Sequence, residues 1–114
     1  MIHYGVSKTA QIGLANGIAK LTIGTGVTVN SVLPGSTMSE GATNFLSDLA
    51  EQQGKTTTQV EEEFFLNVRP NCLLQRFAST QEVANMVTYL CSPLASATNG
   101  STIRVDGGTV PTIL

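Results

Sequence analysis

Apolar positions at helical spacing predict that the chain begins with a helix. Between residues 3 and about 23, apolar or small side chains recur three or four positions apart. These positions are Val6, Ala10, Gly13, Leu14, Gly17, Ile18 and Leu21. Because a glycine inside a helix costs about 1 kcal/mol relative to alanine, Gly13 and Gly17 indicate close approach to another backbone. With Ala10 they form a small-residue stripe suited to tight packing on a sheet or a second helix.

A buried strand is predicted directly after this helix. Gly24 and Gly26 are typical of a helix C-terminus. Residues 27–33 are mostly β-branched or apolar on both faces, which is the pattern of a strand covered on both sides in a parallel sheet. Pro34 and Gly35 stop that strand. Helix, tight turn and buried strand in this order form half of a βαβ crossover.

Residues 36 to about 77 have a different pattern, with hydroxyl residues at their start. A short helix is predicted there, with Phe45, Leu46 and Leu49 on one side and Gly54 ending it. An excursion of about 40 residues is longer than ordinary connections, and such lengths are typical of lids or binding loops.

A capping box predicts a further helix within this excursion. Thr58 with Glu61 fits the box and begins a helix at about 59–67. The acidic residues 61–63 then lie in its first turn, where the helix dipole favours negative charge. We interpret this acidic run as a solvated helix start, not as a metal site.

A second capping box predicts the last helix. Ser79 with Glu82 begins a helix over residues 79–91. Its predicted buried stripe is Val83, Ala84, Val87, Leu90 and Cys91. Residues 102–105 then predict a second short strand, followed by a turn.

Composition excludes several classes of function. The chain has 114 residues, of which 41% are hydrophobic and only 12% charged, against about 25% charged in an ordinary soluble domain. A net charge of -2 argues against nucleic-acid binding, and no apolar run approaches the roughly 20 residues that span a bilayer. No signal-peptide pattern is present, so we expect a cytoplasmic protein with Cys72 and Cys91 reduced. His3 is the sole histidine, which excludes a multi-histidine metal site, and no metal is predicted.

Candidate chemistry lies at the start of the first helix. Tyr4 and Lys8 are four positions apart, which places both side chains on one helical face. A free tyrosine has a pKa near ~10, and a nearby ammonium group favours the phenolate and lowers that pKa. The pair is therefore a candidate acid/base for protonating a carbonyl or deprotonating an alcohol. The alternative is a solvated face with a snorkelling lysine, because this spacing alone is a weak motif.

Four features, taken in order, carry a resemblance to a known family. They are Tyr4-Gly5-Val6-Ser7-Lys8, then Val29-Asn30-Ser31-Val32-Leu33-Pro34-Gly35, then the capped helix after Arg76-Phe77, then Val105-Asp106-Gly107-Gly108. With them the chain resembles the C-terminal half of the short-chain dehydrogenase/reductase domain. The resemblance implies an α/β fold: half of a Rossmann-like doubly wound parallel sheet, with two strands and about four or five helices, incomplete as a domain.

The resemblance also implies an organisation of the chain. Residues 1–114 form a single partial domain. Within it, residues 1–35 are the catalytic helix and following strand, 36–77 the substrate lid, and 78–114 the last helix and strand. The apolar residues of the lid favour a partly apolar substrate.

The resemblance implies an oxidoreductase that uses NAD or NADP, for the complete protein, on a small-molecule alcohol or carbonyl. Tyr4 then passes a proton to or from the substrate oxygen. Lys8 binds the nicotinamide ribose hydroxyls and lowers the pKa of that tyrosine, so both residues also belong to the cofactor site. The remaining expected cofactor-binding residues are Pro34 and Gly35 along the nicotinamide, and Thr37 and Ser39 at the carboxamide or pyrophosphate.

Two parts of the family pattern are missing from this sequence. The glycine-rich phosphate loop and the serine that polarises the carbonyl both precede the segment that matches Tyr4. We therefore expect a fragment that needs a missing N-terminal half or a homo-oligomer partner, and whether the chain is itself an enzyme is left open.

The sequence offers two other functions. A non-enzymatic truncated remnant, or an association module that dimerises through the first helix, is the main alternative. A serine hydrolase using Ser31 or Ser7 with His3 and Asp106 is disfavoured, because neither serine lies in a nucleophile-elbow context.

Overall fold

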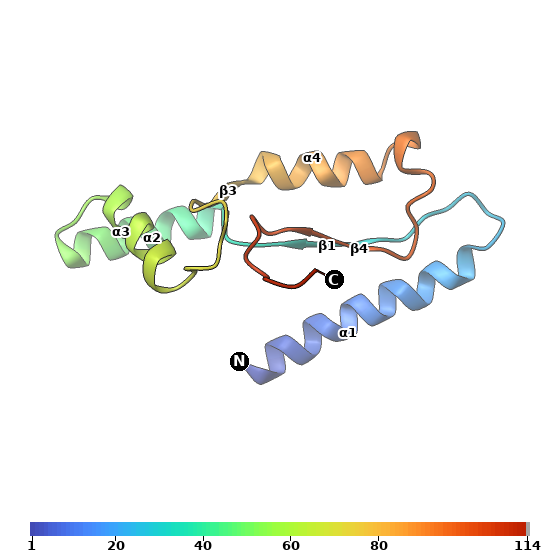
Figure 1. Cartoon of the computed structure of the whole chain (residues 1–114), viewed down its shortest axis with the longest axis horizontal. Helices are drawn as coiled ribbons and strands as arrows, with labels where there is room; N and C mark the ends of the chain where they lie inside the picture. Colours follow the sequence, from blue (N-terminus) through green and yellow to red (C-terminus); the bar gives the residue numbers. More distant parts are fainter. Residues whose placement is uncertain (114) are drawn as a thin grey trace. The chain divides into compact units, whose positions relative to one another are not determined.

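The computed structural model describes residues 1–113 as an α/β chain (Figure 1). The elements in order are α1 (Ile2–Ala19), the short 3₁₀ helix η1 (Lys20–Thr22), β1 (Ser31–Pro34), β2 (Thr37–Met38), α2 (Glu40–Gln53), α3 (Thr57–Asn67), β3 (Ala78–Ser79), α4 (Thr80–Leu90), η2 (Pro93–Ala95) and β4 (Thr102–Val105). β1 pairs with β4 in one two-stranded sheet, and β2 pairs with β3, in parallel, in another. The predicted fold class is confirmed, and the two-residue strands β2 and β3 are additions to it.

The chain divides into two compact units. The first comprises Met1–Leu33 and Asn85–Arg104, and the second begins with Pro34–Ala84 and resumes at Val105. Each unit therefore contains segments that are distant in the sequence, and each is described by itself.

In the first unit, helix α1 is almost entirely exposed. Ala19 is its one buried residue, and Leu14 is 65% exposed. At Gly13 and Gly17 an added Cβ would meet nothing within 4 Å. The prediction that the small-residue stripe packs against another backbone is therefore wrong within residues 1–113. Periodicity identifies the apolar face of a helix, but not what covers it.

The predicted strand at residues 27–33 is shorter than expected. β1 is Ser31–Pro34 and is half-buried, so the prediction of a strand fully covered on both sides is also wrong. Before it, the pairing is irregular: the Val29 amide donates to a side-chain oxygen, Asn99 Oδ1, at 2.8 Å, while the Val29 carbonyl oxygen accepts from the Gly100 amide at 2.9 Å. Pro34 closes the strand as its last residue, a position at which its missing N–H is tolerated.

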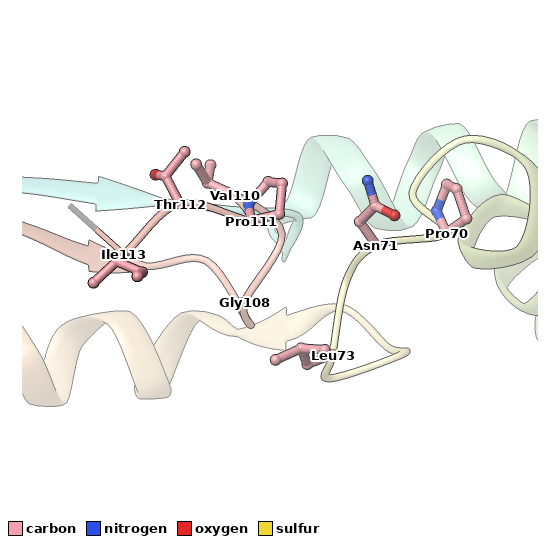
Figure 2. A pocket seen from close by; sticks show the side chains of 8 residues that line it. All are labelled: Pro70, Asn71, Leu73, Gly108, Val110, Pro111, Thr112 and Ile113. Atoms are coloured by element: carbon pink, nitrogen blue, oxygen red, sulfur yellow. The ribbon is translucent and has the colours of Figure 1, made fainter.

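The second unit has an apolar core between α2 and α3, which lie side by side in green in Figure 1. Leu46, Ala50 and Val60 are buried at its centre, with Leu49 packed against them. Phe45, which was predicted to share this side of α2, is 58% exposed, because adjacent helical positions point about 100° apart. Apart from this core, the loop that follows α3 and the segment that follows β4 border an open apolar hollow (Figure 2).

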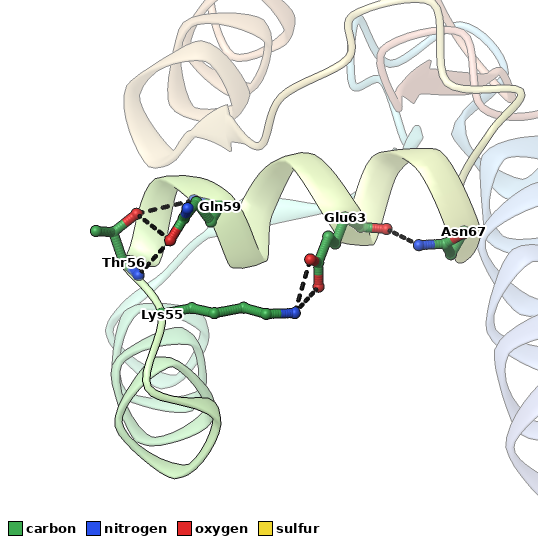
Figure 3. A network of polar contacts seen from close by, with 5 residues as sticks. All are labelled: Lys55, Thr56, Gln59, Glu63 and Asn67. Carbon is green, nitrogen blue, oxygen red and sulfur yellow. Dashed lines mark hydrogen bonds and ion pairs between the residues drawn. The ribbon is translucent and has the colours of Figure 1, made fainter.

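Helix α3 begins two residues earlier than predicted. Its capping box is formed by Thr56 and Gln59, not by Thr58 and Glu61 (Figure 3). The Gln59 amide donates to Thr56 Oγ1 at 3.2 Å, and the Thr56 amide donates to Gln59 Oε1 at 2.9 Å. Thr56 and Thr58 each have a possible capping partner three residues on, Gln59 and Glu61, and the helix begins with the Thr56–Gln59 pair.

The acidic residues 61–63 consequently lie in the middle of α3, and the prediction that they occupy its first turn is wrong. Two of them bind groups outside the helix. Glu63 accepts from Lys55 Nζ at 2.7 Å on both oxygens (Figure 3). Glu61 Oε1 accepts from the Phe77 amide at 3.0 Å. The run therefore ties α3 to its flanking loops.

The capping box of α4 is confirmed. The Glu82 amide donates to Ser79 Oγ at 3.1 Å, and the Ser79 amide donates to Glu82 Oε2 at 2.7 Å. The predicted buried stripe is wrong, because no residue of α4 is buried by the part of the chain that the structure describes. Ala84, Val87 and Cys91 are all exposed.

Candidate active site

Helix α1 brings together the two predicted catalytic residues. Tyr4 and Lys8 lie one turn apart on the same face, and Lys8 Nζ is 5.5 Å from the centroid of the Tyr4 ring. At that distance the ammonium group interacts with the ring as a cation–π pair. Tyr4 is 51% exposed, and Lys8 Nζ also donates to Gln11 Oε1 at 3.3 Å. The phenol and the ammonium group are thus both accessible to a ligand on this face.

Local hydrogen bonds hold the turns around this pair. Ser7 Oγ donates to the Tyr4 carbonyl oxygen at 2.8 Å, and Thr9 Oγ1 donates to the Gly5 carbonyl oxygen at 2.9 Å. Such bonds to the preceding turn keep short polar side chains compatible with a helix. The N-cap residue, Met1, supplies no side-chain bond, so the first turn lacks the usual capping stabilisation.

Two of the predicted cofactor-binding residues, Pro34 and Gly35, lie at the turn after β1, in the second unit. A Cβ on Gly35 would lie 2.6 Å from Asp106 Cα and 2.8 Å from the Asp106 carbonyl oxygen. The Gly35 amide donates to the Val105 carbonyl oxygen at 3.0 Å. Gly35 is therefore required by close backbone approach, and the adjoining Pro34 fixes the entry to the turn.

The two predicted hydroxyl ligands already have local partners. Thr37 Oγ1 donates to the Gly35 carbonyl oxygen at 3.0 Å. Ser39 Oγ accepts from the Ala42 amide at 3.3 Å, as the N-cap of α2. A hydroxyl has one donor and two acceptor sites, so the Ser39 proton and the acceptor sites of Thr37 are not used by these bonds.

Asp106, in the loop after β4, has a structural role that the sequence analysis did not predict. The Asp106 carboxylate accepts from the Gly108 amide at 3.0 Å and from the Val110 amide at 3.2 Å. Gly107, at φ +63°, approaches so closely that a Cβ would lie 2.8 Å from Leu74 Cβ. The loop is thereby docked against the segment before β3. The signal in the sequence was an Asx turn, an aspartate two residues before an amide that it can bind.

The hollow in Figure 2 is a further feature that the sequence did not indicate. It measures about 590 Å³ and is lined mainly by apolar side chains. Its lining residues are Pro70, Asn71, Leu73, Gly108, Val110, Pro111, Thr112 and Ile113. They come from two segments about 40 positions apart, which explains why no local pattern predicted it.

An ion pair fixes the segment between α3 and α4. The Arg76 guanidinium binds both oxygens of Glu82, at 2.9 and 2.8 Å. The hydrogen bonds from Arg76, and to a smaller extent the one from the Ser79 amide, lower the pKa of the Glu82 carboxyl from 4.5 to about 2. The same carboxylate raises the pKa of Arg76. Both side chains are exposed, so the pair positions the segment more than it stabilises the fold.

Two other features are absent from residues 1–113. No group of three histidine, cysteine, aspartate or glutamate side chains in that range is arranged to hold a metal ion. None of the helices formed by these residues has the length and apolar character needed to cross a bilayer.

The α/β fold, with a tyrosine and a lysine one turn apart, agrees with the oxidoreductase family that the sequence resembles, and comparison with known proteins supports this. A family model described as "Enoyl-(Acyl carrier protein) reductase" matches residues 1–110. The chain belongs to the short-chain dehydrogenase/reductase family.

Particular relatives show how much of such a protein the chain represents. It is 42% identical over 113 residues to the "Uncharacterized oxidoreductase YvaG" of Bacillus subtilis, covering 99% of this chain and 43% of that protein. It is 44% identical over 110 residues to YvrD of the same organism, covering 96% and 42%. The crystal structure of L-sorbose reductase from Gluconobacter frateurii, complexed with NADPH and L-sorbose, matches with a TM-score of 0.84 and 28% identity, covering 96% of this chain and 41% of that one. The chain thus spans less than half the length of these relatives.

Proposed function

We propose that this chain supplies the catalytic and substrate-binding part of an NAD(P)-dependent short-chain dehydrogenase/reductase that interconverts a carbonyl and an alcohol. The observation that carries the proposal is the Tyr4–Lys8 pair, with 5.5 Å between the ammonium nitrogen and the ring centroid. The structural likeness to L-sorbose reductase, a protein crystallised with NADPH, supports the choice of cofactor.

The chemistry follows from the two side chains. A nicotinamide cofactor supplies or accepts the hydride when it is bound. Tyr4 holds a proton at its phenolic oxygen and passes it to the carbonyl oxygen during reduction, or accepts it from the alcohol during oxidation. Lys8 would stabilise the phenolate by its charge and would donate hydrogen bonds to the ribose hydroxyls of the bound cofactor. An exposed ammonium group beside an exposed phenol fits this pair of tasks.

The second unit provides the remaining roles in the proposal. Pro34 and Gly35 would lie along the nicotinamide of the cofactor, and Thr37 and Ser39 would offer their spare hydrogen-bonding sites to its carboxamide or to the cofactor's pyrophosphate. Residues 36–77 form a lid over a partly apolar small-molecule substrate. The apolar core between α2 and α3 supports this role, since it lets the lid keep its shape.

We propose that turnover also needs a complementary part, either the portion of a relative that this chain does not span or a partner chain. The 43% coverage of YvaG and the absence of a glycine-rich phosphate loop in the sequence support this. Residues 1–114 alone are expected not to bind NAD(H) or NADP(H) tightly. A fluorescence titration that gives a micromolar dissociation constant would contradict that expectation. A cytoplasmic location belongs to the same proposal and is supported by the two free thiols.

The direct test is a chimera in which residues 1–110 replace the matching segment of L-sorbose reductase. The chimera should oxidise NADPH with L-sorbose or an apolar ketone. Tyr4→Phe should lower kcat by about 100-fold or more, with NADPH affinity unchanged. Tyr89→Phe, which removes an exposed phenol on α4, is the matched control and should be silent. Undiminished turnover in Tyr4→Phe, or a parent chimera that binds NADPH and reduces no carbonyl, would refute the proposal.

A second candidate function is favoured by the exposed face of α1. Val6 and Leu14 are exposed there, and the positions beside Gly13 and Gly17 are open. An association module would use this face to pair with another chain, whatever the chemistry. Sedimentation of the 114-residue chain would then show a defined dimer that Leu14→Glu dissociates. A monomer or unspecific aggregate would remove this candidate.

A further inference from the structure

A small group of polar side chains ties helix α1 to the turn before β4. Asn16 Nδ2 donates to the Gly100 carbonyl oxygen at 3.1 Å, and Asn99 Nδ2 donates to Thr22 Oγ1 at 2.9 Å. The Thr22 hydroxyl in turn donates to the Ala19 carbonyl oxygen at 2.8 Å. We name Asn16, Thr22, Asn99 and Gly100 the amide clasp. All four residues belong to the first unit.

Asn99 joins the helix side of the amide clasp to the strand side. Its Oδ1 accepts from the Val29 amide at 2.8 Å, while its Nδ2 reaches Thr22. The neighbouring Gly100 amide donates to the Val29 carbonyl oxygen at 2.9 Å. Asn30 then continues the strand side, since its Oδ1 accepts from the Ser101 amide at 3.0 Å. The side-chain amide of Asn99 therefore bonds both η1, which follows α1, and the segment that leads into β1.

Apolar packing contributes little to the attachment of α1 within the first unit. Ala19 is the only residue of the helix that is buried. Ala19 itself lies at the amide clasp, because a Cβ on Gly100 would be 3.5 Å from its own Cβ. Val6 and Leu14, nearer to Tyr4, are 64% and 65% exposed. Within residues 1–113, the attachment of the helix is thus concentrated near its C-terminal end and is mainly polar.

We infer that the amide clasp sets the direction in which α1 leaves the sheet, and thereby positions Tyr4 and Lys8. Asn16 is twelve residues from Tyr4, which is roughly 18 Å along a helix. With that lever arm, a tilt of about 5° at the clasp moves Tyr4 by about 1.5 Å. A misplacement of that size is enough to slow an enzymatic step by about 100-fold. Asn16, Thr22 and Asn99 are positioning residues in this inference, whose catalytic consequence rests on the proposed function.

The helix side of the amide clasp can be removed without touching its strand side. The double variant Asn16→Ala/Thr22→Val deletes both bonds to α1 and η1, and it leaves Asn99 bonded to the Val29 amide. Thr22→Ser keeps the hydroxyl and serves as the conservative variant. Asn44→Ala, at an exposed position of α2 in the second unit, is the matched control.

The readout is a distance inside the first unit that requires no turnover. Spin labels are attached to the exposed native Cys91 and to Val6→Cys, and the buried Cys72 is replaced by alanine in every variant. The distance distribution between the labels reports the direction of α1. Far-UV circular dichroism and the midpoint of thermal unfolding, measured on the same samples, separate reorientation from loss of fold.

The parent, Thr22→Ser and Asn44→Ala should give one narrow distribution, and the double variant should at least double its width. If the double variant fails to fold, the single variant Asn16→Ala should broaden the distribution to an intermediate extent. Equal widths in the parent and in the folded helix-side variants would overturn the inference, as would a parent distribution that is already broad. In the chimera, the double variant should lower kcat about 100-fold at unchanged KM. If the distance distribution broadens in the double variant while Tyr4→Phe keeps full activity in the chimera, the proposed function is refuted and the inference about the position of α1 stands.

Discussion

The two units of the chain are stabilised in different ways. Of the eight apolar residues that are buried among residues 1–113, the second contains six, and three phenylalanine rings lie together there with centroids 5.1–5.2 Å apart. In the first unit only Ala19 and Ala95 are buried, and side-chain amides make many of the links between segments. The unit that carries Tyr4 and Lys8 is thus the one with the smaller core. The predicted chemistry and the main source of stability lie in different parts of the chain.

A matched pair of leucines tests this difference most strongly. Leu46 in the second unit is 3% exposed, and Leu14 in the first is 65% exposed. Leu46→Ala should lower the free energy of unfolding by about 2–5 kcal/mol, because it removes buried contacts and leaves a cavity. Leu14→Ala should change it by less than about 0.5 kcal/mol. Urea denaturation of both variants measures the contrast, and equal losses would mean that the first unit has a comparable core.

A pair of glycines tests the close approach that fixes the turn after β1. Gly35→Ala should destabilise the chain by about 1–3 kcal/mol, because the new Cβ would meet the Asp106 backbone at 2.6 Å. Gly41→Ala, in helix α2, has only Ser39 Oγ at 4.0 Å nearby and should be neutral or slightly stabilising. Thermal unfolding compares them. A neutral Gly35→Ala would show that the turn can relax away from Asp106.

Two threonines separate the observed start of α3 from the start predicted by the sequence. Thr56→Ala removes the N-cap and should cost about 1 kcal/mol. Thr58→Ala changes a residue inside the helix and should have an effect near zero or slightly favourable. Chemical denaturation distinguishes the two. A larger loss of unfolding free energy for Thr58→Ala than for Thr56→Ala would show that Thr58 and Glu61 form the capping box, as the sequence predicts.

The exposed ion pair should produce a small acid sensitivity in the second unit. The pKa of Glu82 is lowered from 4.5 to about 2 in the folded chain. Its contribution to stability is therefore present above pH 4.5 and is lost as the pH falls through the window from 4.5 to about 2. Glu82→Gln should remove that component from the pH dependence of the unfolding midpoint. A variant as acid-sensitive as the parent would show that other carboxylates account for it.

The features that the sequence predicted correctly are local ones. The Tyr4–Lys8 face and the Ser79–Glu82 box depend on spacings of three or four residues, which a helix fixes by itself. The cap of α3 was missed because consecutive threonines offer competing hydroxyls. The strands β2 and β3 have two residues each, too few to show an alternating pattern.

The features that the sequence could not predict depend on distant contacts. Asn99 bonds to Val29 across 70 positions and to Thr22 across 77, and nothing near Asn99 in the sequence indicates either partner. The exposed faces of α1 and α4 are a second example of a feature that depends on distant contacts. Their apolar periodicity predicted packing faces, and within residues 1–113 Ala19 is the only residue of the two helices that is buried.

The central claim is that Tyr4 and Lys8 act as one unit in proton transfer. A double-mutant cycle on kcat in the chimera, with Tyr4→Phe, Lys8→Met and both together, tests it most directly. Residues that act as a unit are strongly non-additive, so Lys8→Met should cost at least about tenfold in the parent and almost nothing in the Tyr4→Phe background. Fully additive losses would contradict the claim, since each residue would then contribute independently of the other.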